Sequence, residues 1–343
     1  MSEISLEQLY KRFAEGDADA VHDVSLDVAA GELVCLLGPS GCGKTTTLKL
    51  IAGLLHPDSG QVYVGGRQVT DVPAEQRDVV MVFQQHLLFP FLNVEENVGF
   101  GLKMRHMDRA TIRRKVNDML SLMRLEGFEK RKPGQLSSGQ RQRVALARAR
   151  VLEPRVLLLD EPLSNLDAHL RDNMRELILS IKREMQITIV FVTHDQEEAV
   201  LLADRIAVMF DGCIEQQGPG SVFYERPATR EIAEFFGNRN IVSGTKRGQR
   251  VETAVGTFEV GERSVPDGPV HLGIRPESII ARNVGGSIGG ADGRGNSLTV
   301  PVTRRVYMGT HTRFRVRMGD SEWDVFVEAN RLDDNCCEHL TIE

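Results

Sequence analysis

The sequence predicts an α/β domain followed by a smaller, β-rich domain. Up to about residue 240, short apolar runs bounded by turn residues alternate with helical patterns, as strands buried on both faces of a sheet do. After Phe236 the composition changes: residues 285–295 hold six glycines, and Thr312–Met318 alternates polar and apolar residues like a half-buried strand. A chain of 343 residues is long enough for about two domains. We predict domains at 1–237 and 238–343.

The first domain is predicted to contain strands at Ala20–Val28, Leu33–Leu37, Val79–Phe83, Val156–Leu159, Thr188–Val192 and Arg205–Asp211. Strands that alternate with helices are typical of an α/β domain. Residues 88–152 interrupt this alternation with a charged, largely helical stretch, which we interpret as an inserted helical subdomain. The C-terminal part is predicted to form a small β barrel or sandwich.

Charge and cysteine content exclude several classes of protein. The chain has 42 basic and 48 acidic residues, a net charge of −6, which disfavours a general nucleic-acid binder because such proteins need a concentrated positive field. Its five cysteines contain no CxxC pair and their number is odd, so a reducing cytosol fits better than a disulfide framework. Cys336 and Cys337 lie near His339, but incidental thiols are the preferred interpretation because no second ligand pair has zinc spacing.

The N-terminus has no apolar signal-peptide region, and no apolar run approaches the roughly 20 residues that a membrane-spanning helix needs. We therefore expect the protein to act at a membrane only by docking on another polypeptide.

A glycine-rich motif predicts a phosphate-binding loop. The motif G-x-x-x-x-G-K-[ST] and the residue after it are Gly38, Pro39, Ser40, Gly41, Cys42, Gly43, Lys44, Thr45 and Thr46. It lies between an apolar strand and the helical run Thr45–Leu54, the context that the motif requires. Glycines let successive N–H groups surround an anion, and the helix N-terminus adds positive partial charge. Lys44 is expected to contact the β- and γ-phosphates, and the Thr45 hydroxyl to bind Mg²⁺. The chain has no N-K-x-D segment, which disfavours guanine.

Two carboxylates follow the apolar strand Val156–Leu159. In a parallel sheet the carboxyl ends of the strands open into the crevice where ligands bind. Asp160 is expected to hold Mg²⁺, through water, and Glu161 to polarise a water for attack on the γ-phosphate.

Two further polar residues end neighbouring strands. His194 is expected to donate a hydrogen bond to the γ-phosphate or to hold the attacking water. The amide of Gln84 both accepts and donates, so it can touch Mg²⁺ and that water. Gln85 follows directly, and the sequence leaves open which glutamine acts; a solvated turn residue is the alternative for Gln84.

The segment Leu136-Ser-Ser-Gly-Gln140, before the helical run Arg141–Leu152, resembles the LSGGQ signature of ABC transporter ATPases. The phosphate loop, Gln84, the signature, Asp160-Glu161, residues 164–167 and His194 occur in the order of that family. Residues 226–237 and 273–278 resemble the junction and the start of the C-terminal TOBE domain of importer ATPases. The resemblance implies a P-loop NTPase (ABC ATPase) domain with a helical subdomain, followed by a small all-β, OB-like (TOBE) domain.

The resemblance also implies ATP and Mg²⁺ as ligands and a head-to-tail homodimer. Ser137, Gly139 and Gln140 of the signature would serve the nucleotide held by the other subunit, and Asp167 would read the state of the opposite site. Phe13 would stack on adenine; a core phenylalanine is the alternative. Ser138 stands where glycine is usual, which is expected to weaken activity at most.

Transmembrane permease subunits, and indirectly a solute-binding protein, are the implied partners, with the chain peripheral at the cytoplasmic face of the inner membrane. The apolar patch Phe89–Leu92 could receive a partner helix or be local core. No nucleic acid is expected, and for the arginines of residues 304–317 a solvated or interface face is preferred to an oxyanion site.

Residues 307–314 resemble polyamine, ferric iron and phosphonate importers, so the predicted cargo is a polyamine (spermidine/putrescine), with ferric iron or phosphonate next. The alternative function is a soluble ABC ATPase acting on nucleic acid or the ribosome. Relatives of that kind carry long coiled-coil insertions or two ATPase units, which this sequence lacks.

Overall fold

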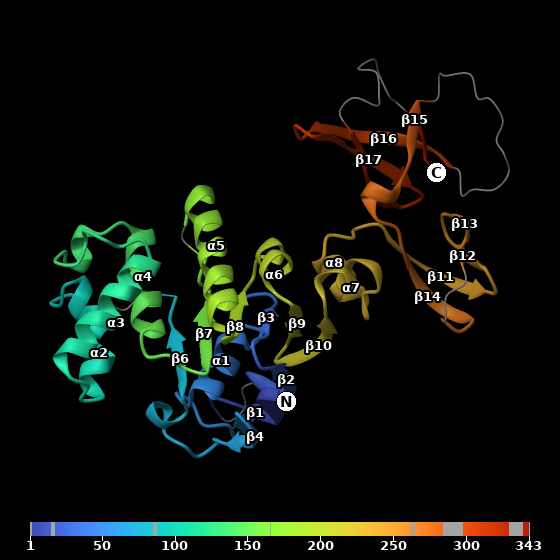
Figure 1. Cartoon of the computed structure of the whole chain (residues 1–343). Helices are drawn as coiled ribbons and strands as arrows, with labels where there is room; N and C mark the ends of the chain where they lie inside the picture. The colour runs from blue at the N-terminus through green and yellow to red at the C-terminus, as the bar shows by residue number, and fades with distance from the viewer. Residues whose placement is uncertain are drawn as a thin grey trace. The chain divides into compact units, whose positions relative to one another are not determined.

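The computed structural model describes residues 2–14, 18–84, 88–164, 166–261, 265–283, 298–328 and 339–342. The chain divides into two compact units, Met1–Val222 and Phe223–Glu343 (Figure 1). Residues 223–236 fall in the second unit because Phe223 stacks on Phe236 at 5.0 Å and Arg275 donates to the Phe236 carbonyl oxygen at 2.6 Å. The boundary at residue 237, which rests on composition, stays a prediction.

A six-stranded sheet forms the centre of the first unit. Its strand order is β10-β9-β3-β8-β7-β6, and β10 is its antiparallel member. The strands are β3 (Leu33–Leu37), β6 (Val79–Val82), β7 (Val156–Asp160), β8 (Thr188–Thr193), β9 (Arg205–Phe210) and β10 (Cys213–Gly218). Five of the six predicted strands belong to this sheet, and their ends agree with the sequence analysis to within one residue.

A second, antiparallel sheet covers one face of the first. Its order is β2-β1-β4-β5, formed by β1 (Ser2–Lys11), β2 (Val21–Ala29), β4 (Ser59–Val64) and β5 (Arg67–Gln68). Helix α1 (Lys44–Ala52) packs into the core that the two sheets share, through buried side chains such as Leu48 and Ile51. This core fixes the first turn of α1 against the parallel sheet.

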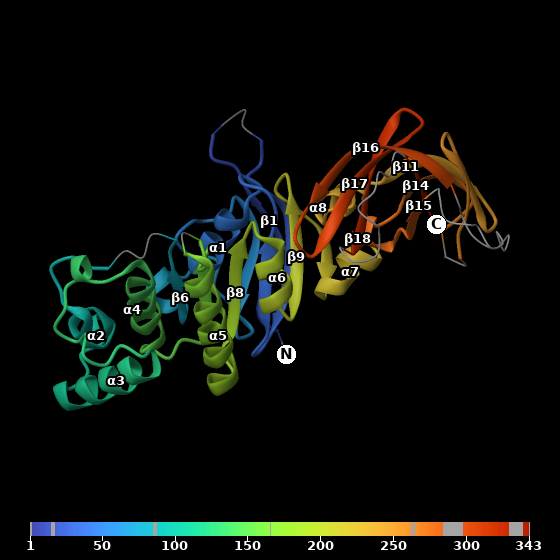
Figure 2. The same cartoon turned by 90° about the horizontal axis from the view of Figure 1, so that it is seen from above.

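The other face of the parallel sheet carries α5 (Ala168–Met185) and α6 (Gln196–Leu202) (Figure 2). Helix α5 buries Met174, Ile178 and Ile181, while α6 buries Ala199 and Leu202. Both helices begin directly after loops that follow strands of the sheet, β7 and β8. Their N-termini therefore lie at its carboxyl edge.

The predicted helical stretch holds α2 (Val94–Met104), α3 (Arg109–Leu122) and α4 (Ser138–Arg150), which lie together beside β6 (Figures 1 and 2). Capping boxes start α2 at Asn93 and α4 at Ser137. Within the described ranges, no helix combines the length and apolar character needed to cross a bilayer.

The second unit contains two antiparallel sheets, in agreement with the predicted β-rich domain. Their orders are β13-β12-β11-β14 and β15-β19-β16-β17-β18. The strands are β11 (Ile241–Arg247), β12 (Arg250–Thr253), β13 (Gly256–Glu259), β14 (Gly268–Gly273), β15 (Ala281–Asn283), β16 (Leu298–Tyr307), β17 (His311–Met318), β18 (Ser321–Glu328) and β19 (His339–Ile342). One core holds both together, with Phe258 and Trp323 stacked at 6.3 Å.

Helix α7 (Gly220–Glu225) spans the division between the units, and α8 (Arg230–Phe235) precedes β11. The glycines of residues 285–295 and the thiols of Cys336 and Cys337 lie outside the described residues.

Candidate nucleotide site

The predicted phosphate loop connects β3 to α1, and its backbone requires glycine. Gly41 and Gly43 have φ of +86° and +98°, which L side chains rarely adopt. A Cβ on Gly38 would lie 2.2 Å from the Met209 carbonyl oxygen, and a Cβ on Gly43 would lie 2.2 Å from that of Ala20. Pro39, Ser40 and Cys42 complete the loop, and Lys44, Thr45 and Thr46 form the first turn of α1.

Lys44 is buried, and its ammonium group is directed back onto the loop. Its Nζ donates to the carbonyl oxygens of Gly38 at 2.8 Å and Pro39 at 2.7 Å, and lies 3.6 Å from the Cys42 Sγ. The cation is thus held directly beside the backbone that would surround an anion.

Thr45 joins α1 to the end of β7. Its hydroxyl donates to the Asp160 Oδ1 at 2.9 Å, and burial raises the pKa of the Asp160 carboxyl while this hydrogen bond opposes the rise. A hydroxyl and a carboxylate oxygen at the mouth of the loop are hard oxygen donors of the kind that Mg²⁺ prefers. The residues present therefore fit that ion.

Two other predicted site residues contact the Glu161 carboxylate. The Gln84 Nε2 donates to its Oε2 at 2.8 Å, and the His194 Nδ1 lies 3.3 Å from its Oε1. Gln84 follows β6, Glu161 follows β7 and His194 follows β8, so the carboxyl edge of the parallel sheet brings the three together. Of the two candidate glutamines, Gln84 makes this contact and Gln85 lies outside the described residues.

The backbone of Glu161 adopts a strained conformation, with φ of +46° in the left-handed region. Its N–H donates to the Val192 carbonyl oxygen at 3.1 Å, and its own carbonyl oxygen accepts from the Ser164 hydroxyl at 2.9 Å. These bonds hold the side chain between Gln84 and His194. No residue pattern around Asp160 and Glu161 in the sequence indicates this turn.

The signature residues form the start of α4. Ser137 caps the helix by accepting from the Gln140 N–H, while the Gln140 side chain accepts from the Ser137 N–H at 2.9 Å. Gly139 is buried, and a Cβ there would lie 3.4 Å from Leu170 of α5. Ser138 has no positive φ, so its backbone does not require the glycine that is usual in the family. Among the described residues, no hydrogen bond joins the signature to the phosphate loop of the same chain.

Phe13 follows β1 and exposes 62% of its surface, which excludes the alternative of a core phenylalanine. Its neighbour Arg12 is fixed twice: the backbone N–H donates to Asp58 and the side chain to Asp19, each at 2.7 Å. The Ala20 N–H donates to the Lys11 carbonyl oxygen at 2.8 Å. The backbone before Phe13 is therefore held in place by hydrogen bonds, and its exposed ring is available for stacking.

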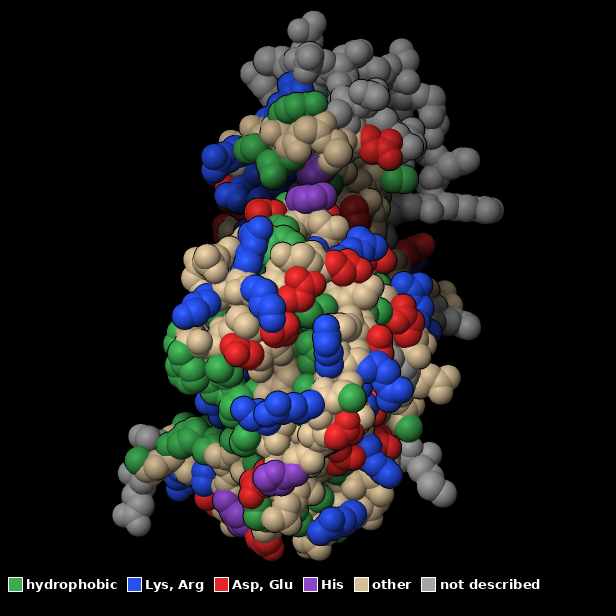
Figure 3. Space-filling view, turned by 60° about the vertical axis from the view of Figure 1, so that its left-hand side comes forward, with side chains coloured by type: hydrophobic (Ala, Val, Ile, Leu, Met, Phe, Trp, Pro, Cys, Tyr) green, Lys and Arg blue, Asp and Glu red, His purple; other side chains and the backbone are tan. Residues whose placement is uncertain are grey.

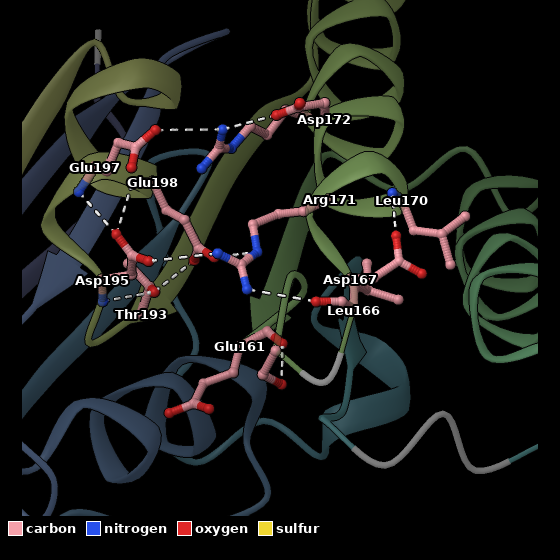
Figure 4. A network of polar contacts seen from close by, with 12 residues as sticks. Glu161, Leu166, Asp167, Leu170, Arg171, Asp172, Thr193, Asp195, Glu197 and Glu198 are labelled. Atoms are coloured by element: carbon pink, nitrogen blue, oxygen red, sulfur yellow. Dashed lines mark hydrogen bonds and ion pairs between the residues drawn. The ribbon is translucent and has the colours of Figure 1, made fainter. Parts of the chain in front are cut away.

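Asp167 is exposed and caps α5 by accepting from the Leu170 N–H at 2.9 Å. Beside it lies a polar network that the sequence analysis missed, centred on Arg171 and reaching Asp195 and Glu198 of the α6 segment (Figure 4). The helical pattern places Arg171 one turn after the cap. Its partners are 24 and 27 residues away (195 − 171 and 198 − 171), and the sequence alone gives no sign of the pairing.

Comparison with known proteins identifies the family. The model of the family described as "ABC transporter" matches residues 21–164, and that described as "TOBE domain" matches residues 272–335. The Fe(3+) ions import ATP-binding protein of Rhizobium meliloti is 46% identical over 88% of this chain and 84% of its own length. The spermidine/putrescine import ATP-binding protein of Rubrobacter xylanophilus is 44% identical over 92% of this chain and 84% of its own length.

Solved structures agree with this result. A dimeric ATP-binding cassette in a post-hydrolysis state, bound to ADP and Pi, is 33% identical with a TM-score of 0.58, covering 63% of this chain and 98% of its own. The cbiO1 protein of Clostridium perfringens, part of an ABC transporter complex, is 28% identical with a TM-score of 0.60, covering 68% of this chain and 95% of its own. The chain therefore belongs to the ABC transporter family, as an ATP-binding import protein with a TOBE domain, and it is an ATPase coupled to transport.

Proposed function

We propose that this chain drives solute import by hydrolysing ATP in a head-to-tail homodimer that docks on separate membrane permease subunits. The observation that carries the proposal is the convergence of Lys44, the Thr45–Asp160 pair and the Gln84–Glu161–His194 cluster at one edge of the parallel sheet. Ligands of open α/β sheets bind at this edge.

In the proposed reaction, Lys44 exchanges its carbonyl partners for the β- and γ-phosphate oxygens of ATP, and Phe13 stacks on the adenine. Glu161 accepts the proton of the attacking water, since the hydrogen bond from Gln84 holds its carboxylate at the carboxyl edge of the parallel sheet. His194, on the other side of that carboxylate, donates a hydrogen bond to the γ-phosphate. A magnesium ion held by Thr45 and Asp160, with Gln84 nearby, would neutralise charge on the phosphate oxygens.

The second half of the site would come from another copy of the chain. Ser137, Gly139 and Gln140 begin α4 in the helical group, and Asp167 is exposed at the start of α5. The dimeric cassettes among the solved relatives support this arrangement. A γ-phosphate that contacts both copies favours the closed dimer, and hydrolysis removes that contact.

The permease is proposed to dock between β6 and the helical group. A cavity of about 270 Å³ opens there, lined by residues that include Met81, Phe89, Phe100 and Leu152. The loop that begins with Phe89 is fixed to α2 by the fully buried Asn97, whose side chain donates to the carbonyl oxygens of Phe89 and Leu92. Phe91, in the same loop, is 69% exposed. An apolar cavity with a rigid, partly exposed aromatic rim suits an inserted helix of a partner.

The cargo is proposed to be a polyamine or ferric iron, the solutes named for the relatives above. The chain would act as a peripheral protein at the cytoplasmic face of the membrane, and a solute-binding protein would select the cargo. No nucleic acid is required: the face in Figure 3 intersperses acidic, basic and hydrophobic side chains and has no single basic field.

The test is co-purification with candidate permease subunits, followed by ATPase assays with binding proteins loaded with spermidine, putrescine, ferric iron or a phosphonate. We expect the chain to co-purify and one loaded protein to stimulate hydrolysis severalfold. Phe91→Asp should abolish co-purification without changing ATP affinity. Tyr307→Asp, which changes an equally exposed aromatic (68%) in the second unit, is the matched control. Failure of the wild-type chain to bind any permease would contradict the proposal.

A further inference from the structure

Arg171 is the side chain at which two loops of the nucleotide site meet. It lies in the first turns of α5, four residues after Asp167. Figure 4 shows its guanidinium between the loop before α5 and the start of α6. It contacts three groups: the Leu166 carbonyl oxygen at 3.4 Å from Nη2, the Asp195 Oδ2 at 3.9 Å from Nη1, and the Glu198 Oε1 at 3.7 Å from Nε.

On the α6 side, this network contains Thr193 and Asp195, the residues on either side of the exposed His194 in the sequence. The second carboxylate oxygen of Glu198 accepts from the Thr193 hydroxyl at 2.7 Å, and the Thr193 Oγ1 accepts from the Asp195 N–H at 3.1 Å. Glu198 is 5% exposed, so this junction is buried. Thr193, before His194, is thus held by one carboxylate that faces Arg171, and Asp195, after His194, supplies the other.

On the α5 side, the Leu166 carbonyl belongs to the loop that presents Asp167. Leu166 is buried, whereas Asp167 is exposed where the proposed dimer places the second copy. A displacement of this loop moves the Leu166 carbonyl, and with it one of the three partners of the guanidinium.

The contacts of Arg171 are long. Charge-assisted hydrogen bonds measure about 2.7–2.9 Å, and none of its three contacts reaches that range. Its Nε is buried and, among the described residues, has no hydrogen-bond partner. A movement of about 1 Å of either loop would turn one ion pair into a hydrogen bond and lengthen another contact. The guanidinium therefore responds to the position of both loops.

We propose that Arg171 is a positioning residue that links His194 to the Asp167 loop, so that a second copy of the chain contacting Asp167 sets the placement of His194 at the γ-phosphate. The inference deepens the proposed function and rests on it. Arg171 reaches neither ATP nor water in this scheme; it acts through Asp195 and Glu198.

The first test is steady-state ATP hydrolysis by the full chain carrying Arg171→Gln. We expect kcat to fall about tenfold, within the usual range of coupling between sites, with the KM for ATP changed less than twofold. Arg171→Lys, which keeps the charge but not the planar fork, should recover part of the loss. Arg175→Gln is the matched control: Arg175 lies one turn further along α5 and pairs with Asp172 and Glu197 instead. Its kcat should stay within twofold of wild type.

The second test is a double-mutant cycle with His194→Ala, measured as single-turnover rates. If Arg171 acts through His194, Arg171→Gln should cause no further loss in the His194→Ala background, while any effect of Arg175→Gln should be additive. Full additivity for Arg171→Gln, or an unchanged kcat in the single variant, overturns the inference and leaves the proposed function standing. A His194→Ala chain with the wild-type rate contradicts the proposed site itself. Arg171→Lys keeps the cycle measurable if Arg171→Gln does not fold.

Discussion

Two buried carboxylates, Glu198 in the first unit and Asp324 in the second, each face arginines, but they are held differently. Asp324 lies 2.5 Å from the Arg313 Nη2 and 3.4 Å from the Arg315 Nε, while Glu198 has its nearest guanidinium atom at 3.7 Å. The backbone of Asp324 is also fixed, because the fully buried Asn240 side chain donates to its carbonyl oxygen and accepts from its N–H.

The short ion pairs of Asp324 stabilise the second unit, whereas the long contact between Glu198 and Arg171 leaves room for the guanidinium to move when a ligand binds. Asp324 pairs with two of the five arginines of residues 304–317, Arg313 and Arg315, so these two are engaged by a buried acid and are not available to another anion. Glu198 lies 3.7 Å from its nearest arginine, Arg171, and that arginine also contacts the loop before α5. A row of like charges in a sequence therefore predicts a binding site only where its partners leave it available.

A third acid gives the largest expected effect. Among the residues that the structure describes, Glu161 contacts Gln84 and His194 and pairs with no arginine, which suits the proposed role of a carboxylate that accepts a proton. Glu161→Gln should reduce ATP turnover by about 10²–10⁴-fold, the usual contribution of a general base, while ATP binding persists and the dimer is trapped. Turnover and sedimentation velocity with ATP measure these outcomes. Glu197→Gln, an exposed acid of α6, is the control, and near wild-type turnover of Glu161→Gln would exclude Glu161 as the base.

The second effect concerns stability. Asp324→Asn removes the buried anion that the Arg313 and Arg315 guanidinium groups share, leaves Arg315 only the exposed Glu322, and should lower the free energy of unfolding by about 1–3 kcal/mol. Trp323, the single tryptophan of the chain, is buried next to the substitution, so its fluorescence reports unfolding of the second unit. Glu322→Gln, which removes a more exposed partner of Arg315 at 3.7 Å, should cost less. Equal losses from the two variants would show that the buried Asp324 stabilises the fold no more than the exposed Glu322 does.

The smallest effect is a pH dependence at Glu198, where burial raises the pKa of the carboxyl against the opposing hydrogen bond from Thr193. A raised folded-state pKa means that the carboxyl favours folding most below its ordinary range and loses this contribution as pH rises through the folded value. Glu198→Gln removes the titration while its amide oxygen can still accept from Thr193. The stability of wild type relative to this variant should therefore decrease from acidic to neutral pH. Thermal unfolding at a series of pH values measures this, and a constant difference would argue against it.

The parallel strands could be predicted because each is a short apolar run buried on both faces. Strand β1 could not, because its register shifts after Leu6 and Gln8 adopts φ of +48°, so that Leu6 and Leu9 are both buried and the two-residue period is broken. The residues of the candidate site belong to motifs of fixed spacing, which the sequence displays directly. Arg171 matters through its distance to another helix, and no local pattern encodes that.

The close approach of Gly43 to Ala20 fixes the spacing between the phosphate loop and the segment that carries Phe13. The space for a side chain at position 43 is filled by the Ala20 carbonyl oxygen, and Ala20 is bonded in turn to Lys11, two residues before Phe13. Phe13, proposed to stack on adenine, and the loop proposed to bind the phosphates are thereby held at a fixed distance from each other. A ligand must match that spacing at both ends to be held, and a larger residue at position 43, where φ is +98°, would strain the loop itself as well as push it away from Ala20.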